Sequence, residues 1–414
     1  MARPLGSTFA SLANPHFRIL WAGTFFAFIA FFMATAVQSV VAFDLSGNNR
    51  AVGFVVFAQG VAQMLLNPFG GALADRMSKK LLISICQAVI TFSFAATAIL
   101  IVTGHITIEL LAAGSFLIGS AFSFLGPARQ GLTVELVGPA LRGNAIALSQ
   151  VSLNASRIAG PFAAAAFLAI GALGPEGAYF FMMALYVGAL LCTWRIPATP
   201  VAQGVRRSFL GEVSAGISYV ARTPRIRGLV LAYILIIMCG FPYISVLPGL
   251  LENELDRRAS DITILLVVNA IGGLIASLGV ASLADSPRAP AVYTLATLVF
   301  GLALVASGVS PAFWVLVLAM FFVGFGGGGF QTLNGALVSH LTEPAYFGRV
   351  ISLTFLAFAA SSVIALPVGI IADAIGERWT ITISGLAVLG VVAAFEFAAR
   401  LRPPLSEAPA GPRP

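Results

Sequence analysis

Long apolar runs alternate with short polar breaks along most of this chain. A helix that crosses a bilayer needs about 20 apolar residues, and the runs divide into segments of that length. Because a backbone in lipid must satisfy its own hydrogen bonds, each segment is predicted to be a helix. The twelve predicted spans are Phe17–Phe43, Val52–Leu73, Leu81–Thr103, Ile108–Gly126, Gly143–Ile170, Ala178–Trp194, Leu229–Leu250, Ile262–Leu283, Ala291–Ser307, Ala312–Leu333, Val350–Ile371 and Thr380–Ala399.

The longest polar break divides these spans into two sets of six. We expect an N-terminal six-helix bundle over residues 1–195, a cytoplasmic linker over 196–228 and a C-terminal six-helix bundle over 229–401. The linker includes an amphipathic pattern from Phe209 to Val220. The proline-rich tail, residues 402–414, is predicted to be disordered. The predicted fold class is an all-α membrane protein with twelve transmembrane helices.

Two segments of the first half recur in the second. Pro139–Leu148 aligns without gaps with Pro344–Leu353, and the tripeptide Leu73–Asp75 recurs as Leu283–Asp285. The matched segments follow the second and fourth spans of each half. Parallel repeats that meet at a central substrate site are one plan of membrane transporters. The repeat therefore predicts two six-helix repeats with a site between them.

Composition and charge support a membrane protein with a defined orientation. Hydrophobic residues make up 59% of the chain and charged residues 9%, with a mean hydropathy of +0.97, which excludes a water-soluble globule. Of the 23 Lys and Arg residues, eighteen fall on the side of the N-terminus and one falls inside a span; the other four are Arg50, Arg257, Arg258 and Arg378. The positive-inside rule then places both termini in the cytoplasm. The net charge of +7 is explained by these loops, so no nucleic-acid partner is expected.

One loop carries a recognisable motif. Residues 71–80 read Gly-Ala-Leu-Ala-Asp-Arg-Met-Ser-Lys-Lys and join the second and third spans. This loop resembles the signature of the major facilitator superfamily between its second and third helices, with Ser78 where that family usually has glycine. The resemblance implies the facilitator fold and a cytoplasmic gate. The candidate gating residues are Asp75, Arg76, Lys79, Glu135 and Arg129.

Further segments resemble one branch of that superfamily. Residues 126–130, 154–161 and 348–353 look like the branch that holds enterobactin-type siderophore exporters and macrolide efflux proteins. Gly160-Pro161 resembles the core of a fifth-helix signature associated with antiporters. Ile118 stands where many proton-coupled drug exporters carry an arginine, which puts a simple transfer of their proton mechanism in doubt. The resemblance implies an efflux protein of the bacterial cytoplasmic (inner) membrane.

Arg157 is the outstanding charged residue inside a predicted span. It lies fourteen positions after Gly143, about 20 Å into the helix. A charge at that depth is costly and suggests a function. A guanidinium there suits carboxylates, catecholates or phosphates. The alternative is a structural arginine that pairs with polar neighbours such as Asn154.

Uncharged polar residues accompany Arg157 in the spans. Residues 59, 63 and 67 step by four, so Gln59, Gln63 and Asn67 share one helix face. Polar groups hidden from lipid either join helices or line a wet cavity, and the sequence leaves both open. Asp44 is the candidate coupling carboxylate, with protons as the candidate ion and an ordinary surface carboxylate as the alternative. The candidate substrate-binding residues are Arg157, Asn154, Gln38, Gln63, Asn269, Gln331 and Asn334.

No motif in the chain predicts a cofactor, a metal or an enzyme. Gly324–Gly329 matches G-x-G-x-x-G, but it lies inside a span without a preceding strand, so a dinucleotide site is rejected. The run instead permits close helix packing. The sequence has no phosphate-binding loop, metalloprotease motif or nucleophile elbow, and its cysteines show no pairing or metal spacing.

Taken with the resemblance, these patterns predict a secondary active transporter. We expect it to export a small amphipathic or anionic molecule, siderophore-like or drug-like, by alternating access and ion-coupled antiport. It is expected to act in the bilayer as a monomer, in siderophore export or multidrug resistance. The alternatives are a facilitated transporter or importer of a small nutrient, and a lipid flippase. A membrane enzyme or receptor is disfavoured by the absent catalytic motifs.

Overall fold

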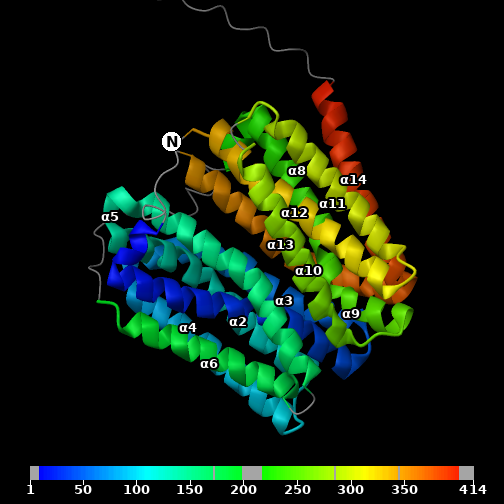
Figure 1. The fold of residues 1–414 in the computed structure, drawn as a ribbon, viewed down its shortest axis with the longest axis horizontal. Helices are drawn as coiled ribbons and strands as arrows, with labels where there is room; N and C mark the ends of the chain where they lie inside the picture. Colours follow the sequence, from blue (N-terminus) through cyan, green and yellow to red (C-terminus); the bar gives the residue numbers. More distant parts are fainter. Residues whose placement is uncertain (1–8, 171–172, 198–216, 284–285, 344–345, 401–414) are drawn as a thin grey trace, which may run out of the picture.

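The described part of the protein consists mainly of helices and the loops that join them (Figure 1). The computed structural model describes residues 9–170, 173–197, 217–283, 286–343 and 346–400. The N-terminal half contains η1 (Ala10–Ala13), α2 (Pro15–Ser46), α3 (Asn49–Arg76), α4 (Lys79–Val102), α5 (Ile108–Ala169) and α6 (Gly174–Trp194). The C-terminal half contains α8 (Pro224–Gly240), η2 (Phe241–Ser245), α9 (Leu247–Gly249), η3 (Leu250–Glu254), η4 (Ala259–Asp261), α10 (Ile262–Ala281), α11 (Ala289–Gly308), α12 (Phe313–Leu341), α13 (Phe347–Ile375) and α14 (Glu377–Arg400).

These helices confirm the predicted fold class. Ten helical segments of the described chain are long and apolar enough to cross a membrane. Two further long segments, α3 and the part of α5 that follows Gly138, are compatible with the remaining two predicted spans. Gly138 has φ 71°, a backbone conformation that glycine adopts without strain, and it separates the two parts of α5.

Some predicted boundaries are wrong. The fourth span was expected to end at Gly126, but its helix continues to Gly138, so helical structure extends well past the apolar run. The seventh span was expected to run unbroken from Leu229 to Leu250. Instead α8 gives way to the 3-10 helix η2 at Phe241, because Pro242 cannot donate a backbone hydrogen bond. Most of the predicted amphipathic stretch lies outside the described residues.

The turn between α2 and α3 follows from three consecutive residues. Gly47 ends α2 with φ 64°, a left-handed conformation common at helix C-termini. Asn48 then caps α3, and its side chain accepts a hydrogen bond from the Ala51 N–H at 2.9 Å. Asn49 therefore starts α3 at a fixed position, which matters for the contacts described below.

Small residues set the helix spacing within each half. A Cβ atom at Gly160 would lie 2.6 Å from the Cβ of Phe32, so α5 packs directly on α2. In α12, a Cβ at Gly326 would collide with the backbone of α11, and one at Gly324 or Gly328 with that of α10. The glycine run thus serves close packing, as its sequence suggested.

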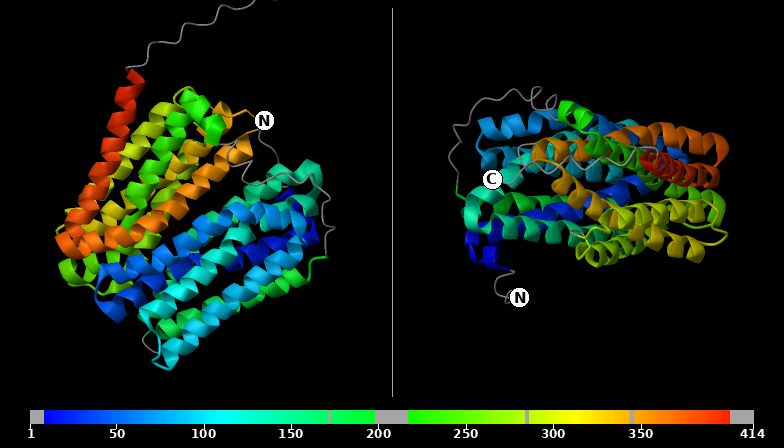
Figure 2. Two further views of the ribbon diagram at one scale, coloured as in Figure 1. Left: turned by 180° about the vertical axis from the view of Figure 1, so that it is seen from behind. Right: turned by 90° about the horizontal axis from the view of Figure 1, so that it is seen from above.

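The two halves meet mainly through α3 and α13, which run antiparallel. A Cβ at Gly53 would lie 2.5 Å from the Ala365 carbonyl oxygen, and one at Gly60 would lie 2.6 Å from the Cβ of Ser362. We call the end of the molecule where α3 begins the Asn49 end and the opposite end, where α4 begins, the Lys79 end. The bundles lie together near α3 and α9, towards the Asn49 end, and diverge towards the ends where α2 and α13 begin (Figures 1 and 2).

Candidate functional site

A cavity of about 220 Å³ lies between the halves. Helices α2 and α3 supply its wall on one side, and η2 and α13 supply it on the other. Its lining residues are Phe31, Thr35, Gln38, Ser39, Val52, Val55, Val56, Gln59, Gln63, Phe241, Pro242, Ile244, Ser245, Phe358, Ser361, Ser362 and Ala365. A site shared by two bundles can change shape when the bundles move.

The wall of this cavity is neutral and amphipathic. Hydroxyl groups come from both halves and amide groups from the N-terminal half, all among three phenylalanines, and none of the lining residues is charged. Two of the predicted binding residues, Gln38 and Gln63, lie on this wall. Gln59 lies there too, on the face that its four-residue spacing from Gln63 predicts. Such a wall can hydrogen-bond polar groups of a molecule while the aromatic rings contact its apolar part.

Arg157 lies beside the interface between the halves but outside the lining of this cavity. Its guanidinium carbon is 5.8 Å from the ring centroid of Phe32 in α2, within the range of a cation–π contact. Tyr233 of α8, in the other half, lies close enough for electrostatic interaction. The Nε atom of Arg157 is buried and has no hydrogen-bond partner among the described residues. A buried unpaired donor is costly, so this guanidinium retains the capacity to bind an anionic group.

Aromatic rings connect Arg157 to the cavity. The ring of Phe31, which lines the cavity, lies edge-on to Phe32 with centroids 5.5 Å apart. Phe31 also stacks on Phe122 of α5 at 4.3 Å. Arg157 is therefore separated from the cavity wall by about one layer of aromatic side chains. A molecule with an aromatic body and an acidic group could contact both regions.

The remaining predicted binding residues are not brought into the cavity. Asn269 donates to the Tyr243 hydroxyl and to the Met320 carbonyl, both at 3.3 Å, so it joins elements of the C-terminal half. Gln331 donates to a carbonyl of its own helix. Asn334 is buried, with no partner for its Oδ1 among the described residues, and Asn154 is half-buried. None of these four lines the cavity.

The candidate gating residues lie at the Lys79 end, and those with described contacts face their own half. Lys79 is buried and makes an ion pair with Glu135 of α5 at 2.5 Å. Arg129 is buried with its guanidinium carbon 5.0 Å from the Phe28 ring centroid. Arg76 is exposed at the end of α3, and the side chain of Asp75 lies outside the described part of the structure. The gating role of these residues stays a prediction.

At the opposite end, Asp44 is exposed near the end of α2. That position does not test its predicted coupling role. A polar cluster that the sequence reasoning missed lies at the same end of the molecule. Asn49 contacts both Asp373 and Glu377, which come from the other half. No local signal could have found this cluster, because Asn49 is more than 300 positions from both of its partners.

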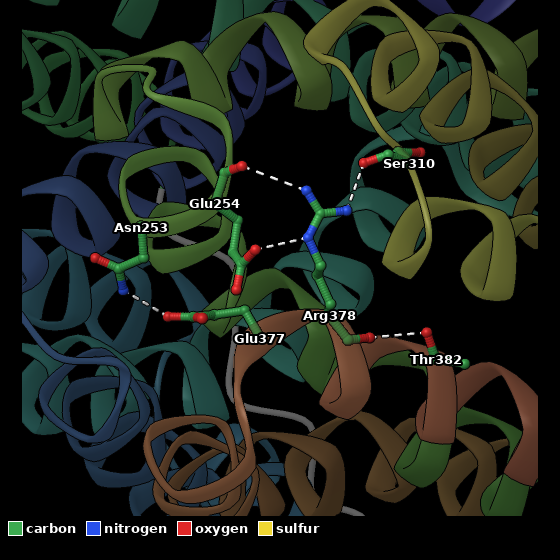
Figure 3. Close-up of polar contacts among 6 residues, drawn as sticks. All are labelled: Asn253, Glu254, Ser310, Glu377, Arg378 and Thr382. Carbon is green, nitrogen blue, oxygen red and sulfur yellow. Dashed lines mark hydrogen bonds and ion pairs between the residues drawn. The ribbon is translucent and has the colours of Figure 1, made fainter.

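Figure 3 shows the part of this cluster that belongs to the C-terminal half. Arg378 donates from Nε to the Glu254 carboxylate at 2.7 Å and from Nη1 to the Ser310 carbonyl at 2.6 Å. Asn253 donates to Glu377 at 2.6 Å. The beginning of α14 is thereby tied to η3 and to the loop between α11 and α12.

Two helical bundles with an amphipathic cavity between them are the architecture of a secondary transporter of the major facilitator type. Comparison with known proteins identifies the family. A family model described as transmembrane secretion effector matches residues 6–410, and the chain belongs to that family.

Several characterised bacterial transporters are similar to this chain. The staphyloferrin A transporter of Staphylococcus aureus (strain NCTC 8325 / PS 47) is 25% identical over 362 residues, which cover 86% of this chain and 89% of that protein. Macrolide efflux protein A of Streptococcus pyogenes is 21% identical over 384 residues, covering 90% of this chain and 93% of that protein. The predicted membership of the facilitator superfamily and the resemblance to its siderophore and macrolide branch are confirmed.

Solved structures share the fold. The nucleoside transporter NupG matches with a TM-score of 0.76 at 14% identity, covering 94% of this chain and all of that chain. A bacterial homologue of the human lysosomal transporter Spinster, in an inward-facing and unoccupied conformation, matches with a TM-score of 0.74 at 12% identity. That match covers 96% of this chain and 98% of the other. These similarities establish the architecture.

Proposed function

We propose that this protein is a secondary active exporter of a small amphipathic or anionic molecule, and that it works by alternating access. The observation that carries the proposal is the neutral, partly aromatic cavity between the halves, with Arg157 one aromatic layer away. Amide, hydroxyl and ring contacts would hold the body of the molecule, and the guanidinium would bind an acidic group. Membership of a secretion family and similarity to siderophore and macrolide transporters support the outward direction.

The proposed orientation places the Lys79 end in the cytoplasm of a bacterial cell and both termini on that side of the inner membrane. The concentration of Lys and Arg in the loops of that side supports it. The divergence of the bundles towards the beginnings of α2 and α13 would then correspond to a form closed on the outer side (Figure 2). Ion-coupled antiport, with protons as the candidate ion, would supply the energy for export, with Asp44 as a candidate coupling group.

Everted membrane vesicles test this proposal. A panel of neutral amphipathic compounds and of aromatic carboxylates or catecholates would be screened for uptake, with and without an imposed pH gradient. The account predicts saturable uptake of at least one compound into energised vesicles, and reduced uptake when the gradient is collapsed. Uptake that does not depend on any ion gradient would favour a facilitated transporter. Purified protein in liposomes that moves none of the panel would contradict transport of these classes.

Arg157 variants test the anionic part of the proposal. Arg157→Lys keeps the charge but loses the planar fork, so affinity for an anionic compound should fall several-fold, whereas Arg157→Ala should lose about tenfold or more. Binding is measured as the rise in melting temperature of purified protein with added compound. Arg129→Ala, which removes a buried arginine elsewhere in α5, is the control and should lower the melting temperature without ligand. Unchanged affinity in folded Arg157→Ala protein would exclude this role.

A further inference from the structure

We propose that Asp373 and Glu377 form a latch that holds the two halves together at the Asn49 end, with the first turn of α3 as its partner. The backbone N–H of Asn49 donates to Asp373 Oδ1 at 2.8 Å, and that of Arg50 donates to Asp373 Oδ2 at 2.9 Å. Both oxygens of one carboxylate therefore bind the start of a helix from the other half. The N–H groups of a first turn lack partners in their own helix, and the positive end of the helix dipole also lies there, so a carboxylate is well placed.

The side chain of Asn49 extends this contact to a second carboxylate. Its Nδ2 donates to Asp373 Oδ1 at 3.1 Å and to Glu377 Oε1 at 2.8 Å. Asn49 is 1% exposed and Glu377 is 5% exposed, so this pair is shielded from water. Hydrogen bonds to an ionised acceptor are stronger than neutral ones, and shielding strengthens them further.

Residues next to the latch are also bonded within the C-terminal half. Asn253 donates to Glu377, and Arg378 joins Glu254 and Ser310, all within the C-terminal half (Figure 3). Gly249 leaves room for the contact, since a Cβ atom there would collide with the Asn49 amide and lie 2.7 Å from Glu377 Oε1. Glu377 is thus bonded to its own half as well as to the start of α3.

The sequence places Asp373 within a repeated pattern. Near the end of α13, residues 369–373 read Gly-Ile-Ile-Ala-Asp, and near the end of α3, residues 71–75 read Gly-Ala-Leu-Ala-Asp. Because α3 and α13 pack antiparallel, the two aspartates lie at opposite ends of the pair. Asp373 accordingly stands beside the start of α3 when the bundles close at the Asn49 end.

Opening of the Asn49 end would break every one of these contacts between the halves. The latch would therefore add to the stability of the closed form relative to the open one, and its loss would shift the balance by about tenfold. This inference rests on alternating access in the proposed function. It concerns conformation, so its test does not depend on the transported compound.

The test measures the distance across the Asn49 end by electron paramagnetic resonance. Spin labels are attached at Leu45→Cys in the N-terminal half and Val309→Cys in the C-terminal half, two exposed positions, with the native cysteines replaced by serine. Asp373→Asn removes the charge with little change of shape. We expect it to raise the ratio of long to short distances by about tenfold. Asp256→Asn, the same change at an exposed acid of the η3–η4 loop, should leave the ratio unchanged.

A second variant separates the latch from a simple loss of folding. Asn49→Ala should raise the ratio about threefold, and its combination with Asp373→Asn should give less than the product of the two effects, because both act on one contact. An unchanged ratio in folded Asp373→Asn protein, or independent effects of the two changes, would overturn the latch. If wild-type protein transports a compound in vesicles but Asp373→Asn leaves the ratio of long to short distances unchanged, only the latch is ruled out. If Asp373→Asn raises that ratio but wild-type protein transports no compound, the proposed function is ruled out instead.

Discussion

The two ends of the molecule use their polar side chains differently. At the Lys79 end, the described bonds stay within one half: Lys79 pairs with Glu135, and Lys80 donates to the carbonyls of Trp194 and Ile196. At the Asn49 end, Asn49 and Arg50 bond across the halves to Asp373. The first set joins α4 to α5 and to the end of α6 within the N-terminal half, and the second joins that half to its counterpart. Among the described residues, these hydrogen bonds between the halves therefore lie at the Asn49 end.

Packing along α3 and α13 agrees with this difference. The close backbone contacts of Gly53 with Ala365, Gly60 with Ser362 and Gly369 with Asn49 run from the Asn49 end to the middle of the molecule. The hydrogen bonds between the halves and the close glycine contacts thus lie in the same interface between α3 and α13. At the Asn49 end, close packing as well as hydrogen bonds to carboxylates holds the halves together.

The largest effect is expected from filling this packed surface. In Gly53→Ala the new methyl group would lie 2.5 Å from the Ala365 carbonyl oxygen, and that backbone atom cannot move aside alone. We expect separation of the halves at the Asn49 end and a loss of about 1–3 kcal/mol of stability. The melting temperature and the Leu45–Val309 label distance measure both effects. Gly390→Ala, at a helix position with open space, is the matched control and should be neutral or slightly stabilising. Equal behaviour of the two variants would show that the close contact does not matter.

A smaller effect is expected at the Lys79 end. Glu135→Gln leaves the buried ammonium of Lys79 without its carboxylate, and because the Glu135 side chain is 29% exposed this should cost only about 1–1.5 kcal/mol of unfolding free energy. Adding Lys79→Met should recover part of that loss, because the unpaired charge is removed. Denaturation of the purified variants measures both. If Glu135→Gln changes the label distance across the Asn49 end as much as Asp373→Asn does, the pair acts as the gate that its loop motif suggested.

The smallest effect is expected from the ion pair that supports the latch. Arg378 and Glu254 are each about one-third exposed, so solvent screens their attraction. Arg378→Lys keeps the charge but loses the fork that reaches both Glu254 and Ser310, and about 0.5–1 kcal/mol of stability should be lost. The difference in melting temperature from wild type should shrink as salt is raised. A difference that does not depend on salt would indicate that the lost contact is mainly to the Ser310 carbonyl.

Periodic patterns predicted much of the fold and part of the site. The length of the apolar runs identified the helices, and the four-residue spacing of Gln59 and Gln63 predicted their shared helix face, which in the structure lines the cavity. Arg157 lies in α5, within the span in which the sequence placed it, and its binding role stays a prediction. These features depend on neighbours in the chain, and helix geometry is sufficient to infer them.

Features that depend on contacts between distant segments could not be predicted. Nothing near Asn49 or Asp373 indicates that they meet, since 324 positions separate them. The same applies to Asn269, whose amide serves helix packing rather than the cavity because Tyr243 and Met320 lie beside it. The break at Phe241 was missed because apolar composition continues through Pro242. The role of a polar residue such as Asn49 or Asn269 depends on which distant residues lie beside it in the fold, and the local sequence does not show them.

The most direct test of the difference between the ends is the accessibility of the cavity from each side of the membrane. Thr35 lines the cavity, and Thr35→Cys in a protein without its native cysteines would be exposed to a membrane-impermeant thiol reagent in intact cells and in everted vesicles. The account predicts faster labelling in everted vesicles, where the Lys79 end faces the reagent, and a shift towards labelling in intact cells when Asp373→Asn is added. Equal labelling from both sides, or faster labelling in intact cells of the protein with its latch, would contradict it.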